Sequence, residues 1–277
     1  MIVAPGIYPR GSIDYDAIQA VNFSTLKELS VSAKRYRHRL RSPRKATSPM
    51  ALGSAAHTAV LEPHRFMSDY ALFTGKIRRG KKWDAFVATN EGKSIIKADE
   101  HAEAMAMRDA IRSDSVAKRY IEFGEAEVAL VWTDEETGLL CKGRVDWLCH
   151  DPADVLADVK TSGNIESYRF CQSAAKLQYH LQTAFYSDGY KAITGRDPEF
   201  KVIAVEQSDP HDVAVYDMPP EVLDQGREDY RELLAKLRSH QSFGTWPGYA
   251  NGSELTFQLP AWALTEDDEL TELGLER

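Results

Sequence analysis

Cysteine is scarce in this sequence of 277 residues, which contains only Cys141, Cys149 and Cys171. The three form no CxxC pair and are odd in number, so reduced thiols in a cytoplasmic protein are the simplest interpretation. They are also too few for an iron–sulfur cluster held by four thiolates.

Long hydrophobic runs are missing as well. No stretch approaches the roughly 20 apolar residues of a membrane-spanning helix, so we expect no membrane partner. The first twelve residues, MIVAPGIYPRGS, contain no basic region followed by a long apolar run, and we therefore expect no secretion signal.

Negative charges outnumber positive ones, and both are unevenly distributed along the sequence. The net charge of −8 is a weak argument against a nucleic-acid partner. Residues 34–45 (KRYRHRLRSPRK) are nevertheless basic, residues 76–83 (KIRRGKKW) form a second basic cluster that ends on an aromatic residue, and residues 265–277 are strongly acidic. Each basic run alone fits a solvated helix face equally well. Two such runs together favour phosphate binding.

Hydrophobic periodicity predicts helices first and then a sheet flanked by helices, within one α/β domain. The expected helices cover residues 14–40, 48–66, 98–121, 166–194 and 219–240, and the expected strands cover 126–134, 138–150, 153–162, 199–208 and 212–218. We expect a loop over 73–95 and a turn at 151–154. The single domain, 1–277, would contain an N-terminal helical part to about residue 121, a catalytic sheet core over about 122–218, and a C-terminal helix and acidic tail over 219–277.

The segment GRVDWLCHDPADVLADVKTS, residues 143–162, carries three charges in two strand-like runs. The period of two places Asp158 and Lys160 on one face of their strand, and the turn allows Asp146 to approach Asp158. Two neighbouring carboxylates repel unless a cation lies between them, and hard divalent cations such as magnesium accept such oxygen ligands. A lysine beside the metal can orient or deprotonate a water nucleophile, or neutralise charge on a phosphate.

Each of these residues also has a purely structural interpretation. An Asp–Lys ion pair on a solvent-facing strand explains Asp158 and Lys160. A histidine among small residues, such as His57, is more often a satisfied core residue. Gln182 and Tyr186 lie four residues apart on one helical face, where surface hydrogen bonding is the simpler role.

The order of the motifs is more specific than any one of them. LGSAAHTAVLEP, AE before a strand, GRVD, DVKT and QxxxY follow one another along the chain. This order resembles the RecB-like branch of the PD-(D/E)xK nuclease superfamily, and more closely the family of RecE (exonuclease VIII) and its phage-encoded relatives. PGIY near the start and WPGY…LPAWA near the end extend the resemblance over residues 4–263. The sequence departs from the signature in having Val145 before Asp146, and Asp in place of Glu in DVK.

The resemblance implies a restriction-endonuclease-like core, with a mixed central sheet flanked by helices and an N-terminal helical extension. It implies a 5′-to-3′ exonuclease that acts on double-stranded DNA ends, releases mononucleotides and leaves 3′ overhangs. Its partner in phage recombination would be a single-strand annealing protein of the RecT or Beta type, in the cytoplasm of a bacterial host cell. Members of the family form rings of three or four subunits around DNA.

The resemblance also implies two magnesium ions, for which manganese can substitute, while calcium should bind and catalyse poorly. One ion would be held by His57, Asp146, Asp158 and the carbonyl of Val159. Glu127 and Asp158 would help to hold the second ion. A Glu at the start of a strand is, however, usually a solvent residue.

The remaining roles concern water and DNA. Lys160 would position the attacking water, and Gln182 and Tyr186 would support the lysine or the scissile phosphate. Ser24 and Lys27, near an expected helix start, would hold a 5′ phosphate. The expected DNA-binding residues are Arg35, Arg37, Arg78, Arg79, Lys81, Lys82 and Trp83, of which the tryptophan could stack on a base.

Three alternatives remain open. The first is another nuclease of the superfamily, either an endonuclease or a 3′-to-5′ single-strand exonuclease of the Cas4 type, although a Cas4 enzyme would have a cysteine cluster. The second is a non-catalytic DNA-binding module, which would be expected to lose Asp158 or Lys160. The third is a metal-dependent phosphatase for small molecules, which would not need the basic clusters.

Overall fold

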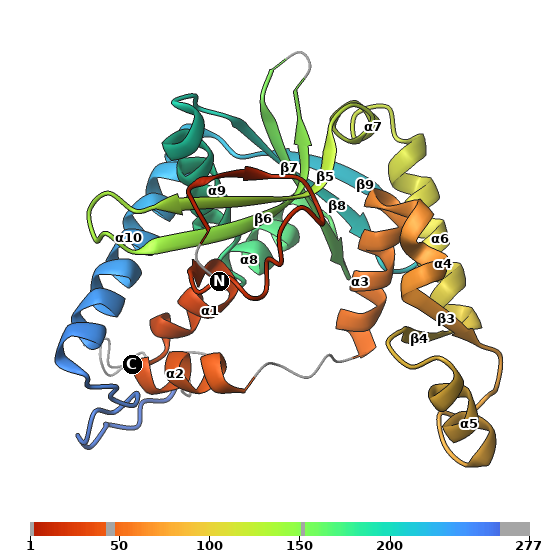
Figure 1. Ribbon diagram of the computed structural model, residues 1–277, viewed down its shortest axis with the longest axis horizontal. Helices are drawn as coiled ribbons and strands as arrows, with labels where there is room; N and C mark the ends of the chain where they lie inside the picture. The colour runs from red at the N-terminus through yellow and green to blue at the C-terminus, as the bar shows by residue number, and fades with distance from the viewer. Residues whose placement is uncertain (1–2, 43–47, 151–152, 261–277) are drawn as a thin grey trace, which may run out of the picture.

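A mixed sheet of seven strands forms the centre of the computed structural model, which describes residues 3–42, 48–150 and 153–260. The strands are β1 (Gly6–Tyr8), β2 (Val21–Asn22), β5 (Glu125–Thr133), β6 (Leu140–Cys149), β7 (Val155–Ser162), β8 (Glu199–Glu206) and β9 (Val213–Asp217). Their order is β1-β5-β6-β7-β8-β9, with β2 paired to β6 (Figure 1). The β7–β8 and β2–β6 pairs are parallel and the other pairs are antiparallel.

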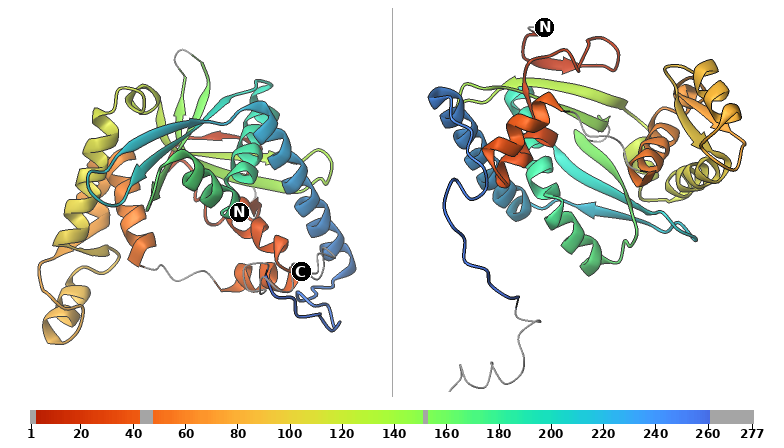
Figure 2. Two further views of the ribbon diagram at one scale, coloured as in Figure 1. Left: turned by 180° about the vertical axis from the view of Figure 1, so that it is seen from behind. Right: turned by 90° about the horizontal axis from the view of Figure 1, so that it is seen from below.

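Helices cover both faces of this sheet, as Figures 1 and 2 show. One face packs against α8 (Ser167–Lys176), α9 (Tyr179–Thr194) and α10 (Pro220–Phe243) and contains the first core cluster. The other face packs against α3 (Ser48–Leu61), α6 (Ala98–Ser113) and α7 (Lys118–Ile121) and contains the second core cluster. The predicted fold class, a mixed central sheet flanked by helices, is confirmed.

The N-terminal segment is less helical than its sequence indicates. The range 14–40, expected as one helix, contains β2 and then α1 (Phe23–Leu26), the 3-10 helix η1 (Lys27–Ser30) and α2 (Ala33–Arg41). Two polar caps divide it: the Asn22 side chain accepts from the Thr25 N–H, and the Ser32 side chain accepts from the Arg35 N–H. Each cap starts a new helix because it satisfies N–H groups that a continuous helix would bond internally.

The range 73–95, expected as a loop, contains a helix. In the described chain, β3 (Tyr70–Phe73), α5 (Lys81–Thr89) and β4 (Ser94–Lys97) follow the short helices η2 (Pro63–Arg65) and α4 (Phe66–Asp69). The parallel pair β3–β4 and α5 form a small lobe that projects from the molecule (Figure 1). The ring of Phe73 lies 5.0 Å from that of Trp83 and 5.2 Å from that of Phe86. These aromatic contacts give α5 a packed apolar face, which could not be recognised from a segment so rich in lysine and arginine.

Two further long helices are interrupted. The expected helix over 166–194 is broken at Gln178, whose φ of 62° is left-handed, and so divides into α8 and α9. The expected helix over 98–121 ends at Asp114, whose side chain accepts from the Val116 and Ala117 N–H groups before α7 begins. The acidic tail at 265–277, the end of the first basic cluster at 43–45 and the first half of the turn at 151–154 lie outside the described residues. Among the described helices, none combines the length and apolar character needed to cross a membrane.

Candidate active site

In the neighbouring strands β5 and β6, the alternation of side chains between the two faces of the sheet is interrupted at an acidic residue. Residues two apart in a strand normally share a face, yet Trp147 packs in the second core cluster and Val145 in the first. The exchange in β6 therefore occurs at Asp146. In the neighbouring strand β5, Glu127 has a φ of 55°, a left-handed conformation that L-residues seldom adopt. Strained backbone of this kind concentrates at functional sites.

Asp146 and Asp158 come together through the pairing of β6 and β7. The paired stretch of β6 and β7 ends with Trp147 opposite Ala157, and Asp146 and Asp158 are the next residues of the two strands. The Val159 N–H donates a 2.8 Å hydrogen bond to Asp146 Oδ2. The pairing of β6 with β7 thus brings the two carboxylates close.

Asp158 and Lys160 share a partner on α9. Asp158 is only 3% exposed and forms an ion pair with the Lys160 ammonium. Gln182 bridges them, since its Nε2 lies 3.4 Å from Asp158 Oδ1 and its Oε1 accepts from Lys160 Nζ at 3.3 Å. The Lys160 ammonium also lies 4.9 Å from the centre of the Tyr179 ring. Lys160 is therefore held in one position by an ion pair, an amide and an aromatic face.

Tyr186 contacts Gln182 from the buried side of the site. It is buried in the first core cluster and its hydroxyl is hydrogen bonded to Gln182, while burial raises the pKa of Tyr186 well above its ordinary value. Gly143 of the GRVD motif makes room for it, because a Cβ there would lie 2.7 Å from the Tyr186 ring. Tyr186 thus orients Gln182 and lies too deep for the surface role considered from its sequence.

A potential ligand group for a metal lies beside the lysine. One ligand atom from each of His57, Glu127 and Asp146 falls within 4.8 Å of the others. His57 Nδ1 reaches Asp146 Oδ2 at 3.4 Å from the small-residue helix α3. All three residues of this group were expected as metal ligands, His57 and Asp146 for one ion and Glu127 for a second. Asp158 stands outside the group, and its part and that of the Val159 carbonyl stay predictions.

The electrostatics of the group favour a cation. Burial, and secondarily the charge of Asp158, raises the pKa of Asp146 to about 7, although His57 and Lys160 act in the opposite direction. Burial lowers the pKa of Lys160, but the charges of Asp158 and Asp146 raise it more, so the net shift is upward. Two carboxylates and an imidazole that converge in this way are suitable ligands for a hard or borderline divalent ion such as magnesium or manganese.

The group opens into a pocket of about 420 Å³. His57, Glu127, Val159, Lys160 and Tyr179 are among its lining residues. A substrate in this pocket would therefore meet the ligand group and the lysine together.

Comparisons with known proteins agree with this geometry. A family model described as "PDDEXK-like domain of unknown function (DUF3799)" matches residues 22–258. The chain belongs to this family. Its name describes an acidic-x-Lys pair preceded by a further aspartate, the pattern that Asp158, Lys160 and Asp146 form here. No sequence among the curated proteins matches the chain.

One solved structure shares the fold. A crystal structure from Eubacterium rectale, described as a "Putative exonuclease", superposes with a TM-score of 0.58 at 14% identity, covering 90% of this chain and 93% of that chain. A crystal structure of a protein called SSO0001 has a TM-score of 0.29 at 11% identity, covering 76% of this chain and 84% of that one, and it carries no weight for the fold.

Two arginines at the site were not anticipated from the sequence. Arg10 Nη1 lies 2.6 Å from Glu127 Oε2, and Arg144 Nε lies 3.0 Å from the same atom. Arg144 stands two residues before Asp146 in GRVD, which is a signal that could have drawn attention to it. Arg10 is 117 residues from Glu127 and has no such signal.

The expected DNA-binding residues of the first basic cluster separate into two kinds. Arg35 Nε is paired with Glu28 at 2.5 Å, so part of its charge is neutralised. Arg37 instead lies over the ring of Trp246, at 5.7 Å from its centre. It lines an open pocket of about 510 Å³ whose other residues are Lys34, His38, Arg41, Trp246 and Gly248.

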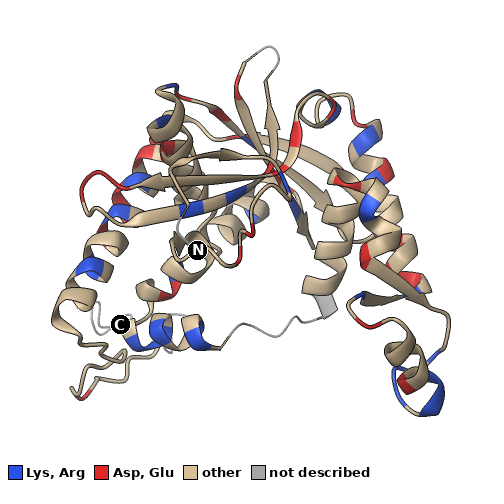
Figure 3. Cartoon of the chain, in the orientation of Figure 1, with Lys and Arg blue, Asp and Glu red and all other residues tan. Residues whose placement is uncertain are grey.

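The second basic cluster divides in the same way. Arg78 Nη2 binds Glu100 at 2.5 Å and the carbonyl of Ile95 at 3.2 Å, and Trp83 packs against Phe73, so both have structural roles. Arg79, Lys81 and Lys82 are exposed, the last two on α5 rather than on a loop. Figure 3 shows the basic positions of α2 and of α5 well apart from one another, with the sheet above both in this view.

The expected 5′-phosphate residues do not lie at the start of a long helix. Ser24 belongs to the four-residue helix α1, whose N-cap is Asn22 rather than Ser24, and its hydroxyl donates to Asn22 Oδ1 at 2.7 Å. The Lys27 ammonium lies 5.6 Å from the centre of the Phe23 ring. Ser24 thus lies in the first turn of α1 and Lys27 is the first residue of η1, and their role as 5′-phosphate ligands stays a prediction.

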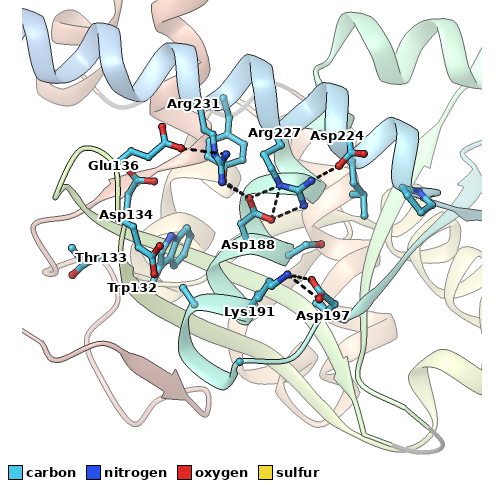
Figure 4. Close-up of a pocket in the computed structure, with 18 residues that line it drawn as sticks. Trp132, Thr133, Asp134, Glu136, Asp188, Lys191, Asp197, Asp224, Arg227 and Arg231 are labelled. Carbon is cyan, nitrogen blue, oxygen red and sulfur yellow. Dashed lines mark hydrogen bonds and ion pairs between the residues drawn. The ribbon is translucent and has the colours of Figure 1, made fainter.

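A larger pocket of about 810 Å³ lies between the β5–β6 turn, α9 and α10 (Figure 4). Its charges are paired with one another: Arg227 binds Asp188 at 2.8 Å, Tyr230 donates to Asp188 at 2.6 Å, and Lys191 binds Asp197 at 2.8 Å. Among the described residues, the group of three converging ligand atoms lies at the smaller pocket, so this larger pocket is a poorer place for a cation.

Proposed function

We propose that the protein is a divalent-metal-dependent 5′-to-3′ exonuclease that acts on double-stranded DNA ends, releases mononucleotides and leaves 3′ overhangs. The observation that carries the proposal is the close association of Asp158, Lys160 and Gln182 with the His57–Glu127–Asp146 ligand group. Phosphodiester hydrolysis needs both an activated water and neutralisation of phosphate charge, and this site offers groups for each.

We assign a separate role to each group of residues. His57, Glu127 and Asp146 would hold a divalent ion, which supplies a Lewis acid to the phosphate oxygens when bound. Lys160, positioned by its two partners, would donate a hydrogen bond to the attacking water and offset charge on the phosphate.

The choice of DNA ends, polarity and partner rests on the resemblance of the motifs to the RecE family. The structural neighbour from Eubacterium rectale is itself described as a "Putative exonuclease", which supports the same reaction class. We further propose that the protein assembles as a ring of three or four subunits and supplies 3′ overhangs to an annealing protein of the RecT or Beta type. The exposed Arg79, Lys81 and Lys82 would contact the duplex backbone.

Digestion of end-labelled DNA tests this proposal. A linear duplex carries a label at one 5′ or one 3′ end, with a closed circular duplex as the control for internal cleavage. We expect rapid release of labelled mononucleotide from the 5′ end in magnesium, none in EDTA, and an intact circle. Loss of the 3′ label first would reverse the polarity, and cleavage of the circle would indicate an endonuclease.

A further inference from the structure

Two arginines converge on one oxygen atom of the ligand group. Arg10 and Arg144 both bind Glu127 Oε2, at 2.6 Å and 3.0 Å. Their side chains remain 29% and 41% exposed, and both line the pocket that contains Lys160. Two guanidinium groups therefore stand at the open side of the site while bound to a single carboxylate.

A metal ion would disturb this arrangement. Glu127 belongs with His57 and Asp146 to the group that could hold a divalent ion. An ion bound there places a double positive charge beside the guanidiniums and competes for the same carboxylate, so their hold on Glu127 must weaken. A guanidinium freed in this way presents a planar fork of donors that matches a phosphate group.

Second contacts keep both arginines at the pocket after such a release. Arg10 Nε binds Glu62 at 2.9 Å, independently of Glu127. The Arg144 guanidinium lies 4.9 Å from the centre of the Tyr15 ring, a cation–π contact that Glu127 does not share. The arginines would thus exchange one anion for another without leaving the site.

We propose that Arg10 and Arg144 form a phosphate clamp that Glu127 occupies until a divalent ion takes this carboxylate, which couples metal binding to DNA binding. The inference rests on the proposed function, because the phosphate it concerns is that of DNA. It adds two substrate-binding residues and gives Glu127 a second role, that of holding the clamp closed in the absence of metal.

A mutant cycle measured in EDTA tests the clamp without any catalysis. The probe is a fluorescent duplex with a 5′ phosphate, and the readout is its dissociation constant. Glu127→Ala should tighten binding by about 5- to 150-fold, the usual range for coupled binding events. The same change made in an Arg10→Ala/Arg144→Ala background should have little effect. Glu125→Ala removes an equal charge from an exposed position of the same strand and should produce only a small gain.

The outcomes separate the clamp from the proposed function. Equal gains from Glu127→Ala in both backgrounds would overturn the clamp, since general electrostatics would then explain them. If the wild type fails to bind the duplex even in calcium, the proposed function fails and the clamp with it. Glu127→Gln, which keeps the shape of the side chain, repeats the test should the alanine variant not fold.

Manganese affinity supplies the reciprocal measurement. Arg10→Ala/Arg144→Ala should bind Mn²⁺ more tightly than the wild type, because its competitors for Glu127 are gone. Arg65→Ala is the matched control, since Arg65 contacts Glu62 and Asp69. An unchanged Mn²⁺ affinity in the double variant would contradict the proposal.

Discussion

Lys160 stands between Asp158 and Gln182 in the pocket, and its ammonium is the group that the account assigns to the attacking water. Lys160→Ala should lower the rate of DNA hydrolysis by about 10²- to 10⁴-fold, the usual contribution of a positioned proton-transfer or hydrogen-bonding group. Mn²⁺ binding should remain, because the three ligand residues are intact. Lys191→Ala, in the other pocket, is the control and should leave the rate unchanged.

Gly143 governs the position of Tyr186 and, through it, of Gln182. Gly143→Ala would force the buried ring to move, at a cost of about 1–3 kcal/mol in the free energy of unfolding. Thermal or urea unfolding measures this loss. Gly163→Ala is the matched control, because a Cβ there meets nothing within 4 Å. A Gly143→Ala protein as stable as the control would show that the close packing of Tyr186 is not required.

The sequence predicts the residues of the site whose geometry is local. Asp158 and Lys160 share a face by the period of a strand, Asp146 approaches across a tight turn, and Gln182 lies one helical turn from Tyr186. Arg10 reaches Glu127 only through the tertiary fold, so no periodicity relates the two. Nor does any sequence pattern predict the left-handed φ of Glu127, which lies where the regular alternation of side chains in β5 is interrupted.

At the scale of elements, the position of Gln182 depends on how α10 packs against α9. A Cβ added at Gly226 would overlap the carbonyl oxygen of His180, so the two helices touch here without an intervening side chain. Gly226→Ala should separate them, lowering the free energy of unfolding by about 1–3 kcal/mol and reducing activity together with it. Unfolding and nuclease assays on one preparation check both effects. A loss of stability with unchanged activity would show that the site does not depend on this contact.

The lobe formed by β3, α5 and β4 contains exposed basic residues and one basic residue that is held in an ion pair. Lys81→Ala/Lys82→Ala removes exposed charges and should reduce the slope of log affinity against log salt by about 1–2 without changing the melting temperature. Arg78→Ala removes a partner of Glu100 and should lower the melting temperature. DNA binding at several salt concentrations and thermal unfolding distinguish the two. An unchanged salt slope in the double-lysine variant would remove α5 from the DNA interface.

The elements that the sequence predicts well are those with a strong local period. The five core strands lie within about two residues of their expected ranges, because apolar alternation and turn residues define them. The helix α5 was missed because its apolar face consists of few residues amid lysine and arginine, and depends on Phe73 outside the helix. The break at Gln178 was missed because glutamine is an ordinary helix residue.

At the scale of the whole molecule, metal binding should increase the free energy of unfolding. An ion that binds only the folded chain adds about 2.7 kcal/mol at one hundred times its dissociation constant. We expect Mg²⁺ and Mn²⁺ to raise the melting temperature, EDTA to reverse the rise, and Asp146→Asn to abolish most of it. An equal rise in Asp146→Asn would place the ion elsewhere.

The charge of the whole molecule is acidic, but the cations of α2 and α5 lie apart on two sides of it (Figure 3). The proposed duplex would contact these cations, while acidic surfaces elsewhere discourage nonspecific contacts. The proposed ring of subunits is consistent with such polarity, because head-to-tail contacts can close into a ring.

The central claim is that the smaller pocket, and not the larger one, hydrolyses DNA. The most direct test is the release of acid-soluble nucleotide from a linear duplex in magnesium by the wild type, Asp158→Asn and Asp188→Asn. Both variants replace a buried or half-buried, ion-paired carboxylate: Asp158 pairs with Lys160 of the smaller pocket, and Asp188 lines the larger one. The account predicts loss of activity in Asp158→Asn and retention in the folded fraction of Asp188→Asn. Full activity in Asp158→Asn would contradict it.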